Sequence, residues 1–240
     1  MQRILSAVLI AFCALAVVAA PIPKEAEKLL PPTEKQLEAS RNNLLMIGIA
    51  IHGYSDANGQ TANSIVDGDG KALLSWRVQL LPYLEEEALY KQFKLDEPWD
   101  SKTNLPLSEK IPKVYAPIRV AGKKGETFYR GYNGPSTTFE LGKRLQIPRS
   151  FPDGTSNILA VVEAAEPCIW SKPDDLPYAP KKPLPKLGGL FDGDFHVLLV
   201  DGSVHIGSGK EIDDEHFHLM ITRDDGFVVD RAVALGHKKK

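Results

Sequence analysis

Hydrophobic residues dominate the first segment of the chain. An uncharged run extends from Ile4 to Ala20 behind a single positive residue, Arg3. The run ends in Val17-Val18-Ala19-Ala20, and small residues at this place are typical of a signal peptidase site. We therefore predict a signal peptide at residues 1–19 and an exported protein of the periplasm, the cell envelope or the extracellular medium. The alternative is a retained membrane anchor, which needs about 20 apolar residues, and we expect membrane contact only in that case.

A helical period follows a polar spacer. Residues 20–32 are rich in Pro, Lys and Glu, and Thr33 and Gln36 have the spacing of a capping box. Apolar residues then recur every three or four positions as far as Tyr54, and Asn58-Gly59 is a typical helix end. Because the apolar stripe is too broad for a solvent-exposed helix, we expect this helix to pack on a sheet or on another helix. The stripe contains Leu37, Ser40, Leu44, Ile47 and Ile51, widened by Leu45, Met46 and Ile49.

Short β-rich runs fill the rest of the chain. We predict a loop at 55–72, a short helix or turn at 75–84, and a short helix at 85–93. Asp201-Gly202 lies between two β-rich runs, which predicts a hairpin with positive φ angles at both turn residues. Six prolines between Pro167 and Pro185 predict a long extended loop. Strands are predicted at 113–116, 127–132, 158–163, 195–200, 203–206 and 227–230, and a helix at 213–221.

These elements define the expected architecture. We predict an α+β fold with a long N-terminal helix packed on an irregular, mostly antiparallel sheet with long Pro-rich loops. Residues 33–234 are expected to form one domain, followed by a basic tail at 235–240.

Composition narrows the function classes. The chain has 240 residues, a formal net charge of -2, 18 prolines and 19 glycines. Lys and Arg do not cluster, so nucleic acid is not an expected partner. Removal of the signal peptide also removes Cys13 and leaves Cys168 as the single cysteine, so no intramolecular disulfide can form.

Three ordered phrases resemble a known family. They are Asn42 to Tyr54 followed by Trp76 to Glu85, then Asp153 to Glu163, and then Gly188-Gly189 with Val197 to Val204. Together they resemble the domain of unknown function 1559 family of planctomycete-type bacteria. The resemblance implies a prepilin-like, pseudopilin-like protein, and the family has also been classed as extracellular solute-binding.

The chain departs from the pattern of that family at defined places. Its apolar N-terminal run has no Glu, unlike a prepilin leader, and reads as an ordinary signal peptide. Ser40 and Ala116-Pro117 stand where the family often has cysteines, and Phe191 stands where it often has a histidine. Simultaneous loss of both cysteines fits a pair that is bonded in other members.

Candidate binding residues come from two kinds of feature. Asp153, Thr155 and Asn157 belong to an oxygen-rich loop, which either binds a cation or, as we favour, bonds its own backbone. Glu163 ends an apolar stretch, so its charge must be paired or lie at the sheet rim. The full set of candidate binding residues is Trp76, Tyr83, Asp153, Thr155, Asn157, Glu163 and Asp201.

Three histidines are candidate metal ligands. His216 and His218 would point the same way on a strand and, with His205, would suit zinc or copper. In the helix that we predict at 213–221, these two side chains diverge. We therefore expect no metal site.

The functional expectation is correspondingly broad. No nucleophile elbow, zinc-protease or paired-carboxylate motif is present, so we expect no catalytic residues, no cofactor and no enzyme activity. We expect an exported, non-enzymatic cell-envelope protein with a pseudopilin-like structural or interaction role and with envelope or pilus-like proteins as partners. The alternative is a periplasmic or extracellular solute-binding module. Its small-molecule ligand would occupy a pocket lined by Trp76, Tyr83, Trp99, Tyr132 or Trp170.

Overall fold

Helix α2 (Glu34–Asn58) is the longest element among the described residues of the computed structural model, which are 31–119 and 123–237. Thr33 caps it as predicted: its hydroxyl accepts from the Gln36 backbone N–H, and the Gln36 side chain accepts from the Thr33 backbone N–H. Gly59 ends the helix with a φ of 67°, a left-handed conformation that glycine adopts without strain. The predicted signal peptide, and most of the predicted spacer, lie outside the described residues.

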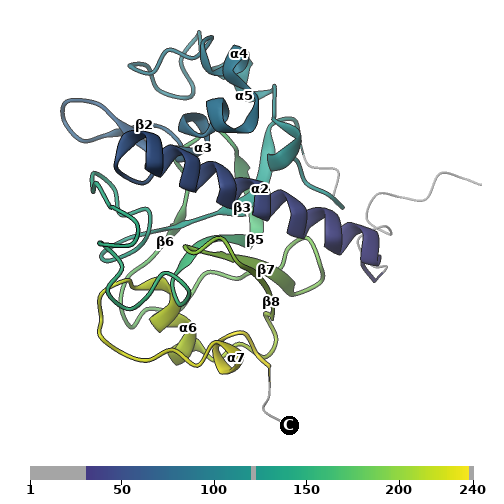
Figure 1. Ribbon diagram of the computed structural model, residues 1–240. Coiled ribbons are helices and arrows are strands. Elements are labelled where there is room, and N and C mark those ends of the chain that lie inside the picture. The colour runs from purple at the N-terminus through teal and green to yellow at the C-terminus, as the bar shows by residue number, and fades with distance from the viewer. Residues whose placement is uncertain (1–30, 120–122, 238–240) are drawn as a thin grey trace, which may run out of the picture.

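A four-stranded antiparallel sheet lies behind α2 in Figure 1. Its strand order is β3-β5-β7-β8, with β3 at Glu126–Arg130, β5 at Leu159–Ile169, β7 at Asp194–Leu199 and β8 at Val204–Ser208. Two smaller pairs accompany it. β1 (Ile65–Val66) pairs with β2 (Ala72–Leu74), and β4 (Tyr132–Asn133) pairs in parallel with β6 (Leu176–Pro177).

Short helices complete the fold at two ends of the molecule (Figure 1). One group consists of α3 (Trp76–Gln79), η1 (Leu81–Leu84), α4 (Glu87–Tyr90), α5 (Leu105–Ser108) and η2 (Lys113–Tyr115). The other group consists of α6 (Asp214–Ile221) and α7 (Arg231–Ala234). The α+β class and the long helix packed on a mostly antiparallel sheet are therefore confirmed.

Strand alternation places α2 and α6 on opposite faces of the sheet. Leu198 approaches α2 closely, because a Cβ built on Gly48 would lie 3.0 Å from its Cδ1 atom. Phe195, Val197 and Leu199 alternate with Leu198 along β7 and belong to the apolar cluster of α6. The Phe195 ring meets the ring of Phe217 on α6 edge-on, with centroids 6.0 Å apart. The protein is thus layered as α2, sheet, then α6 and α7.

The hairpin of β7 and β8 forms as predicted, but its turn differs from the prediction. Among the described residues, Gly202 has a positive φ of 88° whereas Asp201 does not. Leu199 N–H donates to the Ser203 carbonyl, and Gly202 N–H donates to the Leu199 carbonyl. The loop therefore holds three residues and uses one left-handed glycine, rather than two positive φ angles.

Two predicted strands are wrong. Residues 113–116 form the 3-10 helix η2, because Pro112 and Pro117 bracket the segment and the Tyr115 N–H bonds to the Pro112 carbonyl. Residues 227–230 form no strand: Phe227 and Val228 are 67% and 90% exposed, so their side chains gain nothing from a buried sheet face. Asp230 instead caps α7.

The boundaries of other elements differ from the prediction because they depend on pairing between distant segments, which a local sequence pattern does not reveal. The predicted loop at 55–72 contains the end of α2 and strand β1. Strand β5 continues past Glu163 to Ile169, into the segment predicted as an extended Pro-rich loop. At the C-terminal end, Leu235 is buried and the His237 ring bonds to the Ile206 carbonyl, so packed structure continues into the segment 235–237.

Candidate functional site

Glu163 has no exposed surface and lies at the contact between α2 and the sheet. The alternation of β5 and β7 points Glu163 and His196 toward α2. One carboxylate oxygen accepts from the Ser40 hydroxyl of α2. The other accepts from the His196 backbone N–H at 2.6 Å and from its ring Nδ1 at 2.9 Å. The expectation that this carboxylate is paired is met by three donors from two elements.

Tyr129 and Asn43 extend this network. Because Ser40 donates to Glu163, the Tyr129 hydroxyl at 2.8 Å is the donor to Ser40. Asn43 in turn donates to Tyr129 at 3.3 Å. Burial, and secondarily the charge of Glu163, raise the pKa of Tyr129 above its usual range, so Tyr129 stays a neutral phenol.

The network has the residue types of a hydrolase but not the geometry. A serine nucleophile requires its hydroxyl on the imidazole, whereas Ser40 contacts the carboxylate and His196 lies on the other carboxylate oxygen. His196 Nε2 is buried without a hydrogen-bond partner among the described residues, and the ring of Phe191 meets the imidazole edge-on at 5.6 Å. Ser40, Glu163 and His196 are at most 1% exposed, so the arrangement fits a clamp that fixes α2 on the sheet.

Trp76, one of the sequence candidates, lies in the core. It is fully buried, stacks on Phe139 at 4.7 Å and donates from Nε1 to Asp175 at 3.1 Å. Arg77, also fully buried, pairs with the same carboxylate at 3.2 Å and donates to the Tyr129 carbonyl through Nε and Nη2. Trp76 therefore offers no surface to a solute.

The other aromatic candidates do not line one pocket wall either. Tyr83 is half-buried, accepts from Asn58 at 3.0 Å and packs edge-on against Tyr54. Trp170 and Tyr132 are 0% and 3% exposed, and each contributes to a different core cluster. They stabilise the fold.

Three sequence candidates, Asp153, Thr155 and Asn157, lie in one loop, Asp153–Asn157, which we call the bracing loop, and the fourth, Asp201, bonds to it. Asn157 donates to the Asp153 carbonyl at 2.7 Å, the self-bonded turn that the sequence favoured. The Asp201 N–H donates to the Thr155 carbonyl at 3.0 Å. Asp201 itself accepts from the Ser203 N–H and hydroxyl. These residues support neighbouring loops.

The bracing loop also holds the C-terminal segment. The Asp153 carboxylate accepts from the backbone N–H groups of Asp225 and Gly226, at 2.8 and 3.1 Å for the nearest atoms. Ser156 provides a carbonyl for Arg231 at 3.1 Å. Arg231 lines one surface pocket and Asp225 lines another.

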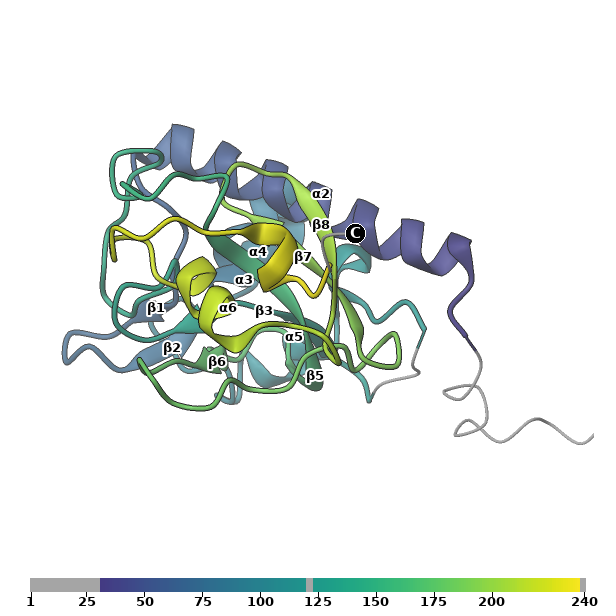
Figure 2. The same ribbon diagram turned by 90° about the horizontal axis from the view of Figure 1, so that it is seen from below.

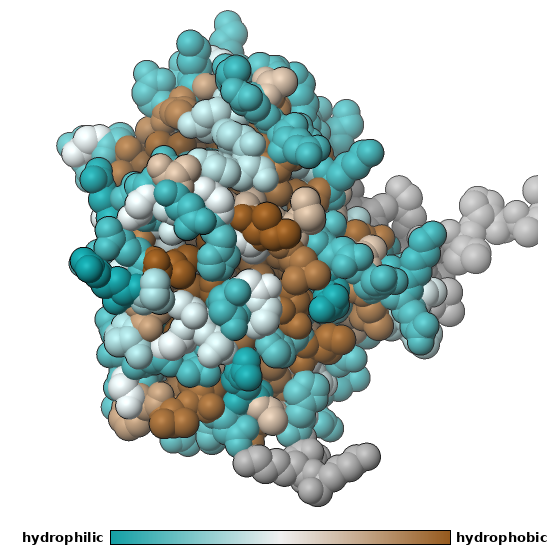
Figure 3. All heavy atoms as spheres, viewed as in Figure 1, coloured by the Kyte–Doolittle hydropathy of each residue, from teal (hydrophilic) through white to brown (hydrophobic). Residues whose placement is uncertain are grey.

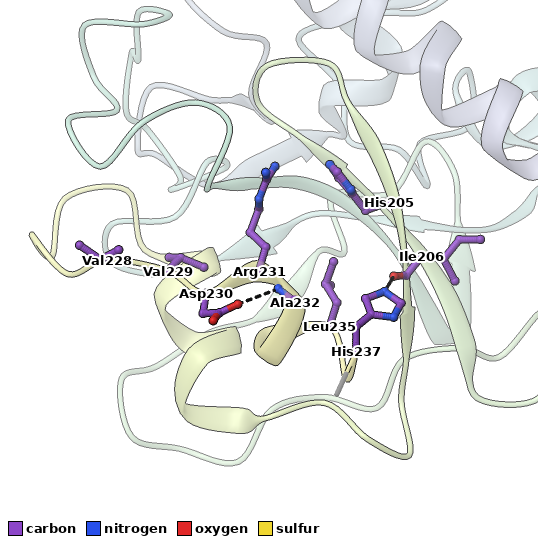
Figure 4. A pocket seen from close by; sticks show the side chains of 9 residues that line it. All are labelled: His205, Ile206, Val228, Val229, Asp230, Arg231, Ala232, Leu235 and His237. Carbon is purple, nitrogen blue, oxygen red and sulfur yellow. Dashed lines mark hydrogen bonds between the residues drawn. The ribbon is translucent and has the colours of Figure 1, made fainter. Parts of the chain in front are cut away.

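The first pocket has a volume of about 580 Å³ and lies between β8 and α7 (Figure 4). Figure 4 shows the side chains of Arg231 and His205 rising side by side, with His237 bonded to the Ile206 carbonyl. Its walls combine three basic side chains with apolar ones. The lining residues are His205, Ile206, Val228, Val229, Asp230, Arg231, Ala232, Leu235 and His237.

The second pocket, of about 590 Å³, lies beside α6. Tyr178, Leu219 and Phe227 supply apolar walls, while Glu215 and Asp225 supply carboxylates. Tyr178 also contacts His218, whose Nδ1 lies 3.3 Å from the tyrosine hydroxyl. Asp225 accepts from the Phe227 N–H, which holds the backbone of Phe227 at the rim.

The three histidines considered as ligands bond different groups. His205 Nε2 lies 3.1 Å from the Ser203 hydroxyl, His216 Nδ1 bonds Asp213 at 3.0 Å, and His218 contacts Tyr178. Helix α6 carries both His216 and His218, as predicted. Within residues 31–119 and 123–237 no three His, Cys, Asp or Glu side chains are grouped so as to hold a metal ion.

Arg231 and His237 were missed by sequence reasoning. Assigning 227–230 to a strand and 235–240 to a tail separated them from the fold. Asp230 followed by Arg-Ala-Val-Ala is a helix N-cap signal that could have revealed α7.

Fold and site together define an α+β protein whose N-terminal helix is clamped to a sheet by a buried polar network. The family model described as "Protein of unknown function (DUF1559)" matches residues 38–186, more than half of the chain, so the chain belongs to this family. Searches of curated proteins and of solved structures gave no match. Every residue that lines the first pocket lies beyond the matched segment.

Proposed function

We propose that this chain is an exported, non-enzymatic protein of the cell envelope that acts through protein contacts on its helix α2. The observation that carries the proposal is the outer side of this helix. Leu44, Ile47 and Ile51 are buried against the sheet, whereas Met46 and Ile49 are 49% and 64% exposed. Large apolar side chains at i and i+3 form a continuous patch on a helix. We define Met46 and Ile49 as the outer patch of α2.

The position of α2 supports a pseudopilin-like role. Figure 2 shows its first turn extending beyond the sheet, at the end of the helix that follows the apolar run of residues 4–20. Figure 3 shows hydrophobic side chains among polar ones on the face that α2 crosses. An exposed apolar patch with a polar rim is typical of a protein contact surface. Among the described helices, none has the length and hydropathy of a membrane span.

The polar network supports a non-enzymatic role. Ser40, Glu163 and His196, the residues closest to a catalytic set, are closed to solvent and bond to one another across two elements. A catalytic group must reach its substrate within hydrogen-bond distance. Burial of all three favours stabilisation of the fold over turnover.

Export is tested by N-terminal sequencing of the protein recovered from fractionated envelopes. A mature chain beginning at Ala20 is expected, with cleavage after Ala19. A chain that keeps Met1 and fractionates with membranes would support the retained anchor. An uncleaved chain found only in the cytosolic fraction would contradict the proposal.

A second candidate function is solute binding, favoured by the apolar pocket beside α6. Its volume of about 590 Å³ lies within the usual range for small-molecule sites, roughly 300–1,000 Å³. Thermal-shift measurements against sugars, amino acids and short peptides test this candidate. Stabilisation that is lost in Phe227→Ala and kept in Met46→Ala would support it, and no shift at millimolar ligand would exclude these classes.

A further inference from the structure

The pocket of Figure 4 lies on the outer edge of the sheet, because β8 ends the strand order. Two contacts cover this edge in part: Ser208 N–H donates to the Leu235 carbonyl at 3.0 Å, and His237 Nε2 donates to the Ile206 carbonyl at 2.8 Å. Since the N–H and C=O of one strand residue point to the same side, the Ile206 N–H also faces this edge. The Ile206 side chain remains 44% exposed.

Three basic side chains line this pocket, and two of them, Arg231 and His205, lie side by side in Figure 4. Arg231 is held by the Ser156 carbonyl at 3.1 Å, which fixes the direction of its guanidinium. His205 is oriented by Ser203, whose hydroxyl donates to Asp201 at 2.6 Å and accepts from His205 Nε2. His237 is oriented by the Ile206 carbonyl. The geometry is therefore set before any ligand arrives.

The polar lining of the pocket consists of one guanidinium, two imidazoles and one carboxylate. Its acidic lining residue, Asp230, accepts from the N–H groups of Ala232 and Val233 at the start of α7. Burial, and then the positive charges of Arg231 and His237, lower the pKa of His205, while Asp201 acts in the opposite direction. The field of Arg231 thus reaches the His205 ring.

Apolar side chains line the remainder. Val229 and Leu235 belong to the pocket wall, and Val228 at its rim is 90% exposed, whereas the Ile206 side chain points away from Arg231 and His205 in Figure 4. A volume of about 580 Å³ accommodates a small organic molecule. A ligand that fits both parts has an anionic head and a hydrocarbon body.

We propose that this pocket binds a small aliphatic carboxylate, with its head on Arg231, His205 and His237 and its hydrocarbon part on Val229 and Leu235. Charge-assisted hydrogen bonds to a guanidinium and to imidazoles are stronger than neutral ones. A free short-chain acid and the C-terminal carboxylate of a peptide share this chemistry. The proposal is independent of the α2 contact surface, so either can fail alone.

Isothermal titration of the full chain tests the head group with hexanoate, hexylammonium and hexanol, which match in length. Hexanoate is expected to bind at least about tenfold more tightly than the other two. Equal or tighter binding of hexylammonium, or no binding of hexanoate at 10 mM, on the order of the weakest useful affinities, would overturn the proposal.

Matched variants test the residues. Arg231→Gln is expected to weaken hexanoate binding about tenfold, whereas Arg41→Gln, an exposed charge on α2, leaves it unchanged. His237→Gln serves as a second variant if loss of Arg231 unfolds α7. Affinity for hexanoate should rise from pH 8 to pH 6 as a bound carboxylate favours protonated His205, roughly in the range where histidine titrates, and His205→Gln should flatten this rise. Equal affinities of Arg231→Gln, His237→Gln and Arg41→Gln would contradict the assignment.

The source of the carboxylate is distinguished with N-acetyl-trivaline and its C-terminal amide. Binding of hexanoate alone supports a free acid, and binding of the peptide acid but not of its amide supports a chain terminus. Equal binding of peptide acid and peptide amide would overturn the carboxylate head group.

Discussion

Glu163 connects elements that are far apart in the sequence. It links Ser40 on α2 to His196 on β7 without exposed surface, and each of its carboxylate oxygens accepts at least one hydrogen bond. The sequence identified this carboxylate as unusual because it follows an apolar stretch. The partners were not predictable, since they are 123 and 33 positions away and depend on sheet register.

Glu163→Ala should destabilise the fold by about 2–4 kcal/mol, because it leaves the His196 N–H and the Ser40 hydroxyl buried without their acceptor. Glu163→Gln should cost less, since its amide oxygen can accept from His196 and its NH₂ can donate to Ser40. Urea unfolding measures both. As a control, Glu109→Ala removes a 62% exposed carboxylate and should change stability by less than about 0.5 kcal/mol. Equal costs for Glu163→Ala and Glu109→Ala would refute the clamp.

At the scale of elements, local signals predicted α2 and the β7–β8 hairpin well. Both combine a clear period with end signals, Thr33 with Gly59 in one case and Asp201-Gly202 in the other. The segments at 113–116 and 227–230 have β-prone composition, yet neither lies in the sheet. Flanking prolines explain the first case, and the N-cap at Asp230 explains the second.

The contact of α2 with β7 yields a prediction at Gly48. Leucine at this position would meet Leu198 and Gly202, because even a Cβ would lie 3.0 and 3.5 Å from their nearest atoms. Gly48→Leu should therefore destabilise the protein by about 1–3 kcal/mol. Ile49→Ser, one residue along but 64% exposed, should be close to neutral in thermal unfolding of the isolated protein. A neutral Gly48→Leu would show that α2 does not pack closely on β7.

At the scale of the whole molecule, the sequence predicts the fold class but not the pockets on the surface. The α+β layers follow from one long helix and several short strands. The pockets do not, because their walls come from β8, α6, α7 and loops that meet only after folding. Sequence candidates Asp153, Thr155 and Asp201 proved to be braces for the segments that form those walls.

Stability of the whole molecule should decrease as the pH falls. Burial and the nearby Arg231 lower the pKa of His205, so the unfolded chain takes up this proton first and stability is lost as the pH drops below about 6.5. The hydrogen bond from the His216 N–H lowers the pKa of Asp213. The stability that ionised Asp213 contributes is therefore present above about pH 4 and is lost at more acidic pH. Urea midpoints at pH 7.5 and 5.5 should differ less in His205→Gln than in the unmodified protein. An identical difference in both proteins would contradict the assignment to His205.

The central claim is that the outer patch of α2 contacts another envelope protein. Site-specific photo-crosslinking in intact cells tests it most directly, with a photoreactive residue placed at Ile49, and at Leu105 as a matched control that is 48% exposed on α5. The proposal predicts a discrete crosslinked envelope protein from position 49 that is absent from position 105 and lost when Met46→Ser is added. No adduct at position 49, or the same adducts from both positions, would contradict it.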